Sequence, residues 1–292
     1  LVAAGNIFMG MTESPVLIKN YLPTMNRSEI FLVMVSGMGT IAGSVMGTYI
    51  GMLGGTDPAA KVLFATHLLS ASVMAVPGSI VLAKMLCPQT EEATDHVAIS
   101  GKEKENSNIL DAISSGTVTG VKLMTNIAAM LLVFISLVAL ANYITEGVIG
   151  RYTGLNDWIV KITDGKAQGL TFQFILGVIT SPFMWLIGVP CQDIMLVGSL
   201  LGQKTILNEF VAYFQLQQWK DAGLFMYEKS ILMSTYILCG FANISSIGIL
   251  LGGLGVLAPE KRGLISRIGV PAMIGGALVS VLSATIIGMI LG

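Results

Sequence analysis

Two glycine-rich segments, SGMGTIAGS at residues 36–44 and GFANISSIG at residues 240–248, lie within long apolar stretches and decide the fold. Glycine at this density weakens a helix by roughly 1 kcal/mol per residue. In lipid, the backbone groups that unwinding frees must find polar partners, so broken helices are tolerated where they line a polar cavity. Close packing of helices through small residues is the alternative explanation. We expect two unwound helix centres whose polar groups come from Thr40, Asn243, Ser245 and Ser246.

The composition around these segments is that of a membrane protein. Of the 292 residues, 53% are hydrophobic and only 11% are charged, whereas a soluble domain carries about 25% charged residues. The net charge of -1 excludes a basic nucleic-acid binder, so no nucleic-acid partner is expected. A spanning helix needs about 20 apolar residues. Windows without Lys, Arg, Asp or Glu meet or approach this length at residues 30–55, 62–83, 124–145, 170–192, 230–259 and 268–292.

The same order of segments occurs twice along the chain. A short apolar segment with one acid (Glu13 or Glu209) precedes each glycine-rich span, and a plain apolar span follows it. Corresponding interrupted segments in two halves are the best sequence pointer to a transporter site near the bilayer midplane. We therefore predict an all-α membrane protein, an inverted-repeat transporter with two re-entrant helical hairpins and two unwound transmembrane helices.

This pattern divides the chain into five segments. Residues 1–86 form the first transport-domain repeat, with the second half of hairpin 1, a broken span and a plain span. A charged loop and interfacial segment follow at 87–123, a scaffold span at 124–146 and an interfacial helix at 147–170. Residues 171–292 form the second transport-domain repeat, with an interfacial arm, hairpin 2, a broken span and a plain span.

Polar residues in the apolar segments suggest two kinds of ligand. Ionisable groups at membrane depth are costly and usually mark an ion or substrate pathway. Glu209 with Asn243 and Ser246 suits a polyhydroxyl ligand such as a sugar ring. Glu13 and Thr12 offer a second polar edge. Apolar walls for a flat ring are available from Phe241, Val45 and Leu123. Either acid alone could instead be a structural carboxylate bonded to hairpin amides.

A hard cation such as Na⁺ requires several oxygen ligands. Asn6, Thr40 and the backbone carbonyls near Met9 and Ile41 could supply them. The sequence contains no metalloprotease, serine-hydrolase, P-loop or Cys–His motif, so we predict that the protein is not an enzyme. Without an ATP-binding motif, any pumping must be secondary transport.

The chain resembles the concentrative nucleoside transporter family over essentially its whole length. Three blocks carry the resemblance: GMTESP at 10–15, NEFVAY at 208–213 and FANISSI at 241–247, which LLGGLG at 250–255 follows. The resemblance implies a homotrimer of scaffold and mobile transport domains that imports nucleosides by symport with Na⁺. For a bacterial member it implies a multi-pass protein of the inner (plasma) membrane. It also implies that the first spans, an interfacial helix and the start of hairpin 1 precede Leu1 in the natural protein.

The resemblance also implies roles for individual residues. The base is held by Met11, Thr12 and Glu13 with Val45 and Leu123, and the ribose by Glu209, Asn243 and Ser246 with Phe241 near the ring. The cation lies at Asn6, Met9, Thr40 and Ile41. Proton-coupled members tend to lack the pair at Asn6 and Thr40, so their presence favours Na⁺. Met11 stands where many members have Gln, which leaves purine, pyrimidine and modified nucleosides open.

Three other functions remain as alternatives. A proton-coupled nucleoside symporter of the same architecture could use Glu13 or Glu209 as the proton carrier. A passive channel or a membrane-embedded scaffold is the second, and a membrane enzyme is the most distant.

Overall fold

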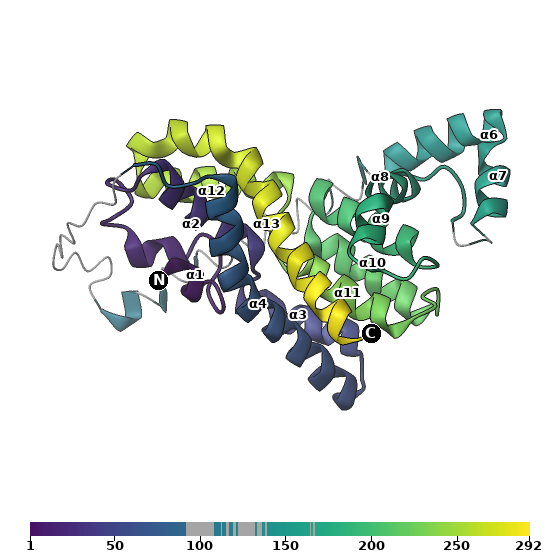
Figure 1. Cartoon of the computed structure of the whole chain (residues 1–292), viewed down its shortest axis with the longest axis horizontal. Coiled ribbons are helices and arrows are strands. Elements are labelled where there is room, and N and C mark those ends of the chain that lie inside the picture. The colour runs from purple at the N-terminus through teal and green to yellow at the C-terminus, as the bar shows by residue number, and fades with distance from the viewer. Residues whose placement is uncertain are drawn as a thin grey trace. The chain divides into compact units, whose positions relative to one another are not determined.

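The computed structural model describes residues 1–91, 108–111, 113–114, 117–118, 121, 132, 136–137, 139–163, 165 and 167–292. The chain forms two compact units. Unit 1 comprises Leu1–Val97 and Gln173–Gly292, and unit 2 comprises Ala98–Phe172. The described residues are helical and contain no strand, as the sequence predicts (Figure 1).

The first repeat in unit 1 begins with short helical turns and continues with three long helices. An asparagine starts the first of these, because the Asn26 side chain accepts a hydrogen bond from the Glu29 amide while the Glu29 carboxylate accepts one from the Asn26 amide. Asp57 caps the last of them by accepting hydrogen bonds from the Ala59 and Ala60 amides, with Pro58 in the first turn. The elements are α1 (Val2–Gly5), η1 (Ser14–Ile18), α2 (Arg27–Gly39), α3 (Gly43–Gly54) and α4 (Pro58–Leu86).

The second repeat contains a pair of helices joined by a tight turn. The helices α9 and α10 pack against each other, and the turn between them is Leu207–Asn208. Asn208 starts α10 because its side chain accepts a hydrogen bond from the Val211 amide at 2.9 Å. The elements are α8 (Phe172–Leu186), α9 (Ile194–Ile206), α10 (Glu209–Asp221), α11 (Glu228–Leu238), α12 (Ile244–Leu257), η3 (Pro259–Lys261) and α13 (Arg262–Ile290).

Both predicted helix interruptions are present, and both are shorter than the glycine-rich segments. The first break separates α2 from α3 at residues 40–42, and the second separates α11 from α12 at residues 239–243. The prediction that residues 36–44 and 240–248 are unwound throughout is therefore too wide. Glycines of the first segment serve close packing instead: a Cβ on Gly37 would lie 2.9 Å from the Met11 Cβ, and one on Gly39 would lie 3.0 Å from the Val279 Cγ1.

The helix α13 forms the centre of unit 1. It packs against α2, α4, α11 and α12, and it crosses the unit diagonally in Figure 1. Two groups of buried apolar side chains lie around it, one containing Met34, Met38 and Val279 and the other containing Tyr49, Tyr213 and Ile237. The two breaks are thereby fixed inside a packed structure.

Three stretches of the described chain are long and apolar enough to cross a membrane. They are Arg27–Gly54, which contains the first break, Pro58–Leu86 and Pro259–Ile290. The window at 170–192 contains the shorter α8, and the window at 230–259 is divided by the second break.

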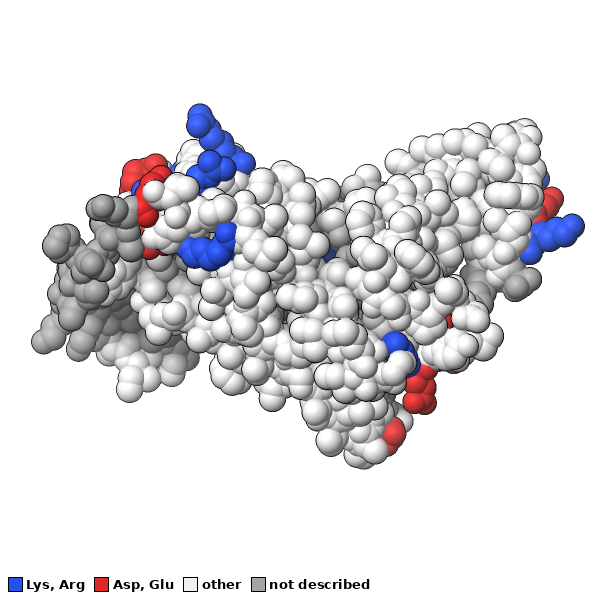
Figure 2. Space-filling model, viewed as in Figure 1, with Lys and Arg blue, Asp and Glu red and all other residues white. Residues whose placement is uncertain are grey.

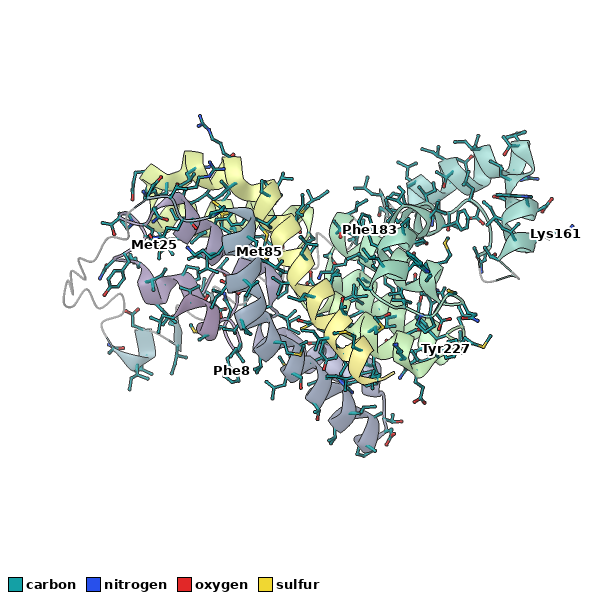
Figure 3. The ribbon with its side chains drawn as sticks, in the orientation of Figure 1. Phe8, Met25, Met85, Lys161, Phe183 and Tyr227 are labelled. Carbon is teal, nitrogen blue, oxygen red and sulfur yellow. The ribbon has the colours of Figure 1, made fainter. Side chains whose placement is uncertain are left out.

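The outside of these helices suits lipid. Exposed apolar side chains follow one face of α13 at a spacing of four residues, and the middle of this helix bears no charge in Figure 2. Phe8, Met85 and Phe183, labelled in Figure 3, are exposed by 71%, 70% and 60%. Such apolar exposure is expected where the solvent is a bilayer. The face of α13 consists of Val270, Ile274, Leu278 and Leu282.

Unit 2 contains a short amphipathic helix within residues 147–170, the segment that the sequence predicts to be interfacial. Its Asn156 side chain donates to the Glu146 carbonyl and accepts from the Leu170 amide, which ties the loop after this helix to the helix before it. Trp158 is 57% exposed. The elements are η2 (Tyr143–Gly150, a π-helix), α6 (Arg151–Thr153) and α7 (Leu155–Ile162). Most of the predicted scaffold span at 124–146 lies outside the described residues.

Candidate functional site

The second break brings a carboxylate and an amide together. Glu209 is the first residue of α10, directly after the hairpin turn, and Asn243 caps α12 directly after the break. The Asn243 Nδ2 donates to the Glu209 Oε2 at 3.0 Å, and its Oδ1 accepts from the Ser246 amide and hydroxyl at 2.9 and 3.0 Å. Glu209 is 8% exposed, and the other two are more deeply buried. The three residues predicted to hold a sugar ring are therefore neighbours.

A tyrosine from the first repeat completes this cluster. Tyr49 lies on α3, is fully buried and donates its hydroxyl to the Glu209 Oε1 at 3.2 Å. Its ring stacks on Tyr213 of α10, with 4.1 Å between the ring centroids. Phe210 also meets this ring in a tilted arrangement, with the centroids 6.2 Å apart. Both carboxylate oxygens of Glu209 are thus bonded, one from each repeat, so the side chain is held in one orientation.

A buried lysine lies on the other side of the second break. Lys204 of α9 donates to the Ile237 carbonyl, in the last turn of α11, at 2.7 Å. It also donates to the Ser280 hydroxyl of α13 at 3.1 Å, and that hydroxyl donates to the Cys239 carbonyl at 3.0 Å. Breaking a helix frees its last carbonyls. Lys204 and Ser280 satisfy two of these acceptors at the end of α11.

The first break is lined by neutral polar groups. The Asn6 Nδ2 donates to the Ser36 hydroxyl at 3.1 Å, and its Oδ1 accepts from the Ser14 hydroxyl at 2.5 Å. The Thr40 hydroxyl donates to the Ser36 carbonyl at 3.0 Å. All four residues are buried. Their oxygens are the hard, uncharged ligands that alkali cations accept from unwound transport helices.

Two further residues predicted for the cation lie at this break. Ile41 is fully buried within it, and Met9 lies in the turn after α1. The neighbouring Phe8 carbonyl accepts a hydrogen bond from the Gly43 amide at 3.0 Å, which holds the first hairpin against the start of α3. The turn after α1 therefore lies beside the first break, and the role of these residues in cation binding stays a prediction.

The two breaks are bonded to each other. The Phe241 amide in the second break donates to the Thr40 carbonyl in the first at 3.2 Å. Gly240 makes this approach possible, because a Cβ there would lie 2.7 Å from the Ser280 hydroxyl and 3.0 Å from the Met38 carbonyl. Its φ of +155° is also a conformation that favours glycine.

The residues predicted to hold a base are less closely associated. Glu13 is exposed, accepts a hydrogen bond from the Gly10 amide at 3.0 Å and has no hydrogen bond to Glu209. Met11 is buried against α2, and Thr12 lies close to Gly253 of α12. Val45 is half-buried beside the cluster of apolar residues around Tyr49. Leu123 lies outside the described residues.

The sequence reasoning missed Tyr49, Lys204, Ser14 and Ser36. Lys204 could have been found from the sequence, because it lies in the apolar stretch before Glu209. Placing a charged lysine there costs as much free energy as placing the glutamate, so it too marks a candidate site. No local sequence signal pointed to Tyr49, since its partner Glu209 is far away in the sequence.

Comparisons with known proteins agree with this architecture. The family model described as "Na+ dependent nucleoside transporter C-terminus" matches residues 67–288. The chain is 40% identical to an uncharacterized transporter of Haemophilus influenzae, over 99% of this chain and 65% of that protein. It is 39% identical to sodium/nucleoside cotransporter 1 of Rattus norvegicus, over 99% of this chain and 44% of that protein.

A solved structure is similar over the same range. CNTnw in an inward-facing substrate-bound state is 36% identical, with a TM-score of 0.81 over 99% of this chain and 63% of that one. The chain therefore spans about two thirds of the length of the bacterial relative. Since the family model covers more than half of the chain, this protein belongs to the Na⁺-dependent nucleoside transporter family.

Proposed function

We propose that this chain forms the transport core of a secondary active transporter that imports nucleosides by symport with Na⁺. The observation that carries the proposal is the direct contact between the two helix breaks, one lined by neutral oxygens and the other by Glu209, Asn243 and Ser246. The family is a transporter family and not an enzyme class, as the sequence predicts.

The second break supplies the nucleoside site in this proposal. Glu209 accepts hydrogen bonds only, whereas Asn243 and Ser246 can both donate and accept. Vicinal ribose hydroxyls would replace the bond between Asn243 and Glu209 with bonds to both residues. In this proposal Phe241 and Val45 give the ring an apolar wall, and Met11, Thr12 and Glu13 reach the base from the first hairpin. Leu123, which the sequence also predicts to contact the base, lies outside the described residues.

The first break supplies the cation site. Na⁺ would bind the side-chain oxygens of Asn6 and Thr40 and the carbonyls of Met9 and Ile41, with Ser14 and Ser36 orienting Asn6. Because Thr40 is bonded to Phe241, ion binding at one break orders the backbone of the other. This arrangement would link the two affinities, and such linkage is reciprocal.

Uptake into proteoliposomes tests the proposal. The full-length protein, supplied with labelled uridine or adenosine, should accumulate the nucleoside only when an inward Na⁺ gradient is present. Equal uptake without any cation gradient would refute the coupling. An Asn6→Ala variant should lose the Na⁺ dependence, while Asn20→Ala, an exposed asparagine near the first hairpin, should keep it.

A proton-coupled symporter is the second candidate, because Glu209 is a buried carboxylate at the proposed nucleoside site. Uptake driven by a pH gradient and indifferent to Na⁺ would establish it.

The same family membership leads us to propose a homotrimer in the inner membrane, which crosslinking in native membranes would test.

A further inference from the structure

The two breaks differ in the charge at the end of the first half-helix. The carbonyl end of a helix carries a partial negative charge, which a cation stabilises. At the end of α2 the polar side chains are neutral, and the proposed Na⁺ supplies the positive charge. At the end of α11 the positive charge belongs to Lys204, whose ammonium lies 2.7 Å from the Ile237 carbonyl.

Lys204 is bound as an alkali cation would be. Its ammonium contacts one backbone carbonyl and one serine hydroxyl, and no carboxylate oxygen of the described residues lies within 4.0 Å of it. The side chain is fully buried. A buried ammonium with no carboxylate in direct contact is costly, so its oxygen ligands and the helix end must stabilise it, together with the longer-range attraction of Glu209.

We propose that Lys204 is a covalently tethered cation that takes, at the second break, the place that exchangeable Na⁺ takes at the first. The comparison with Na⁺ rests on the proposed function. Its consequence is that the second repeat needs no ion of its own, so that the two breaks together bind one Na⁺ for each nucleoside.

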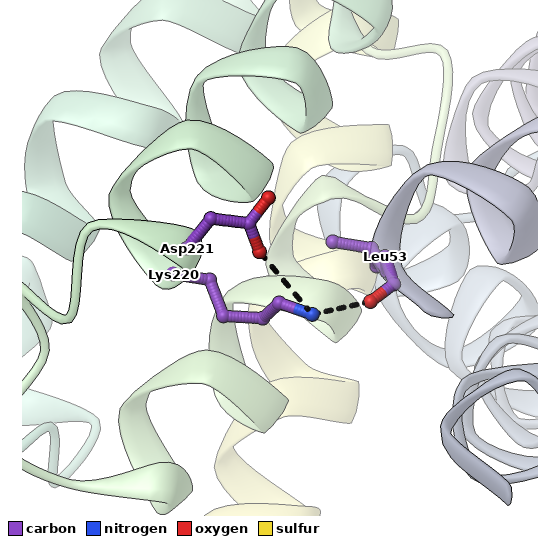
Figure 4. Close-up of polar contacts among 3 residues, drawn as sticks. All are labelled: Leu53, Lys220 and Asp221. Atoms are coloured by element: carbon purple, nitrogen blue, oxygen red, sulfur yellow. Dashed lines mark hydrogen bonds and ion pairs between the residues drawn. The ribbon is translucent and has the colours of Figure 1, made fainter. Parts of the chain in front are cut away.

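A second lysine of the same hairpin provides a matched control. Lys220 of α10 also donates to a carbonyl at a helix end, that of Leu53 in α3, as Figure 4 shows. Unlike Lys204 it is partly exposed, and it is paired with Asp221 at 3.8 Å. Water can replace this lysine when it is removed, whereas removal of the fully buried Lys204 leaves the Ile237 carbonyl without its donor and the Ser280 hydroxyl with one bond fewer.

The experiment compares melting temperatures of the full-length protein in NaCl and in choline chloride at equal ionic strength. Lys204→Ala should melt lower than the wild type in choline, and Na⁺ should raise its melting temperature by more than it raises that of the wild type. The reason is that Na⁺ now binds at the vacated oxygens as well. Lys204→Arg and Lys220→Ala should show the wild-type Na⁺ response.

Nucleoside binding gives an independent measurement. The Na⁺ dependence of binding should steepen in Lys204→Ala, with the Hill coefficient rising from about one toward about two. If Lys204→Ala proves too unstable to purify, Lys204→Gln, which keeps the length of most of the side chain, should show the same steepening.

Two outcomes would overturn the proposal. One is a Lys204→Ala or Lys204→Gln protein that is destabilised but has the wild-type Na⁺ response, since that indicates a merely structural lysine. The other is unchanged stability and unchanged binding in both variants. A wild-type protein that ignores Na⁺ refutes the proposed coupling instead, and the Na⁺ response of the Lys204 variants still reports on the second break.

Discussion

Helix interruption frees backbone groups at both the first and the second break, and different side chains surround them. At residues 40–42 the freed helix end is surrounded by amides and hydroxyls, whereas at residues 239–243 it is surrounded by a lysine, a glutamate and a tyrosine. In the proposed transporter the neutral break accepts and releases the ion. The charged break is stabilised by Lys204 and, in the same proposal, offers the Glu209 carboxylate to a hydroxylated ligand. We therefore propose different roles for the two breaks, ion binding at the first and nucleoside binding at the second.

The largest expected effect concerns the carboxylate that makes the second break distinctive. Glu209→Gln keeps the shape but removes the charged acceptor, so nucleoside affinity should fall by roughly 1.5–3 kcal/mol. Isothermal titration with uridine or adenosine at saturating Na⁺ measures this loss. Glu228→Gln, at the exposed start of α11, should bind as the wild type does. Unchanged affinity in Glu209→Gln would remove the ribose role from the second break.

The contact between the breaks is expected to be the next most sensitive feature. Gly240→Ala places a Cβ against Ser280 and the Met38 carbonyl in a strained backbone conformation, which should destabilise the protein by about 1–3 kcal/mol. A thermal-shift assay measures the loss. Gly248→Ala, where a Cβ meets no atom within 4 Å, is the control. Equal stability of the two variants would contradict the close packing of the breaks.

A smaller effect is expected from the tyrosine that joins the repeats. Tyr49→Phe removes the hydroxyl bonded to Glu209 but keeps the stacking on Tyr213, and should weaken nucleoside binding by about 0.5–1.5 kcal/mol. In a double-mutant cycle the effects of Tyr49→Phe and Glu209→Gln should not add, because the two groups share one hydrogen bond. Strict additivity would show that Tyr49 acts on binding by another route.

The smallest effect is expected at the partly exposed ion pair shown in Figure 4. Asp221 is 60% exposed and lies 3.8 Å from Lys220, so Asp221→Asn should change the free energy of unfolding by less than about 0.5 kcal/mol. Melting curves at low and high salt measure it. A larger change would mean that this pair, and not only Lys220, holds the end of α3.

The sequence predicted the fold well because its signals are local. Charge-free windows and glycine clusters are visible within short stretches, and the structure confirms the helices and both interruptions. The width of the first break was overestimated, because Gly37 and Gly39 look like helix breakers in sequence but are packing contacts in space. Local propensity does not distinguish these two uses of glycine.

The site was predictable only in part. Glu209, Asn243 and Ser246 stand next to the turn and break that bring them together, so their positions followed from the pattern. Tyr49 and Lys204 act on partners in other elements, and a single sequence carries no record of such distant pairs. The roles of all these residues remain predictions until binding is measured.

The hydrogen bond between Phe241 and Thr40 uses backbone atoms alone. Every amino acid except proline carries the same amide donor and every one carries the same carbonyl acceptor. Side chains around the two breaks can therefore be exchanged without loss of this hydrogen bond. In the proposed transporter, selectivity can thus be redesigned by side-chain substitution, whereas uncoupling the ion from the nucleoside requires a change to the main chain, for which Phe241→Pro is the most direct substitution.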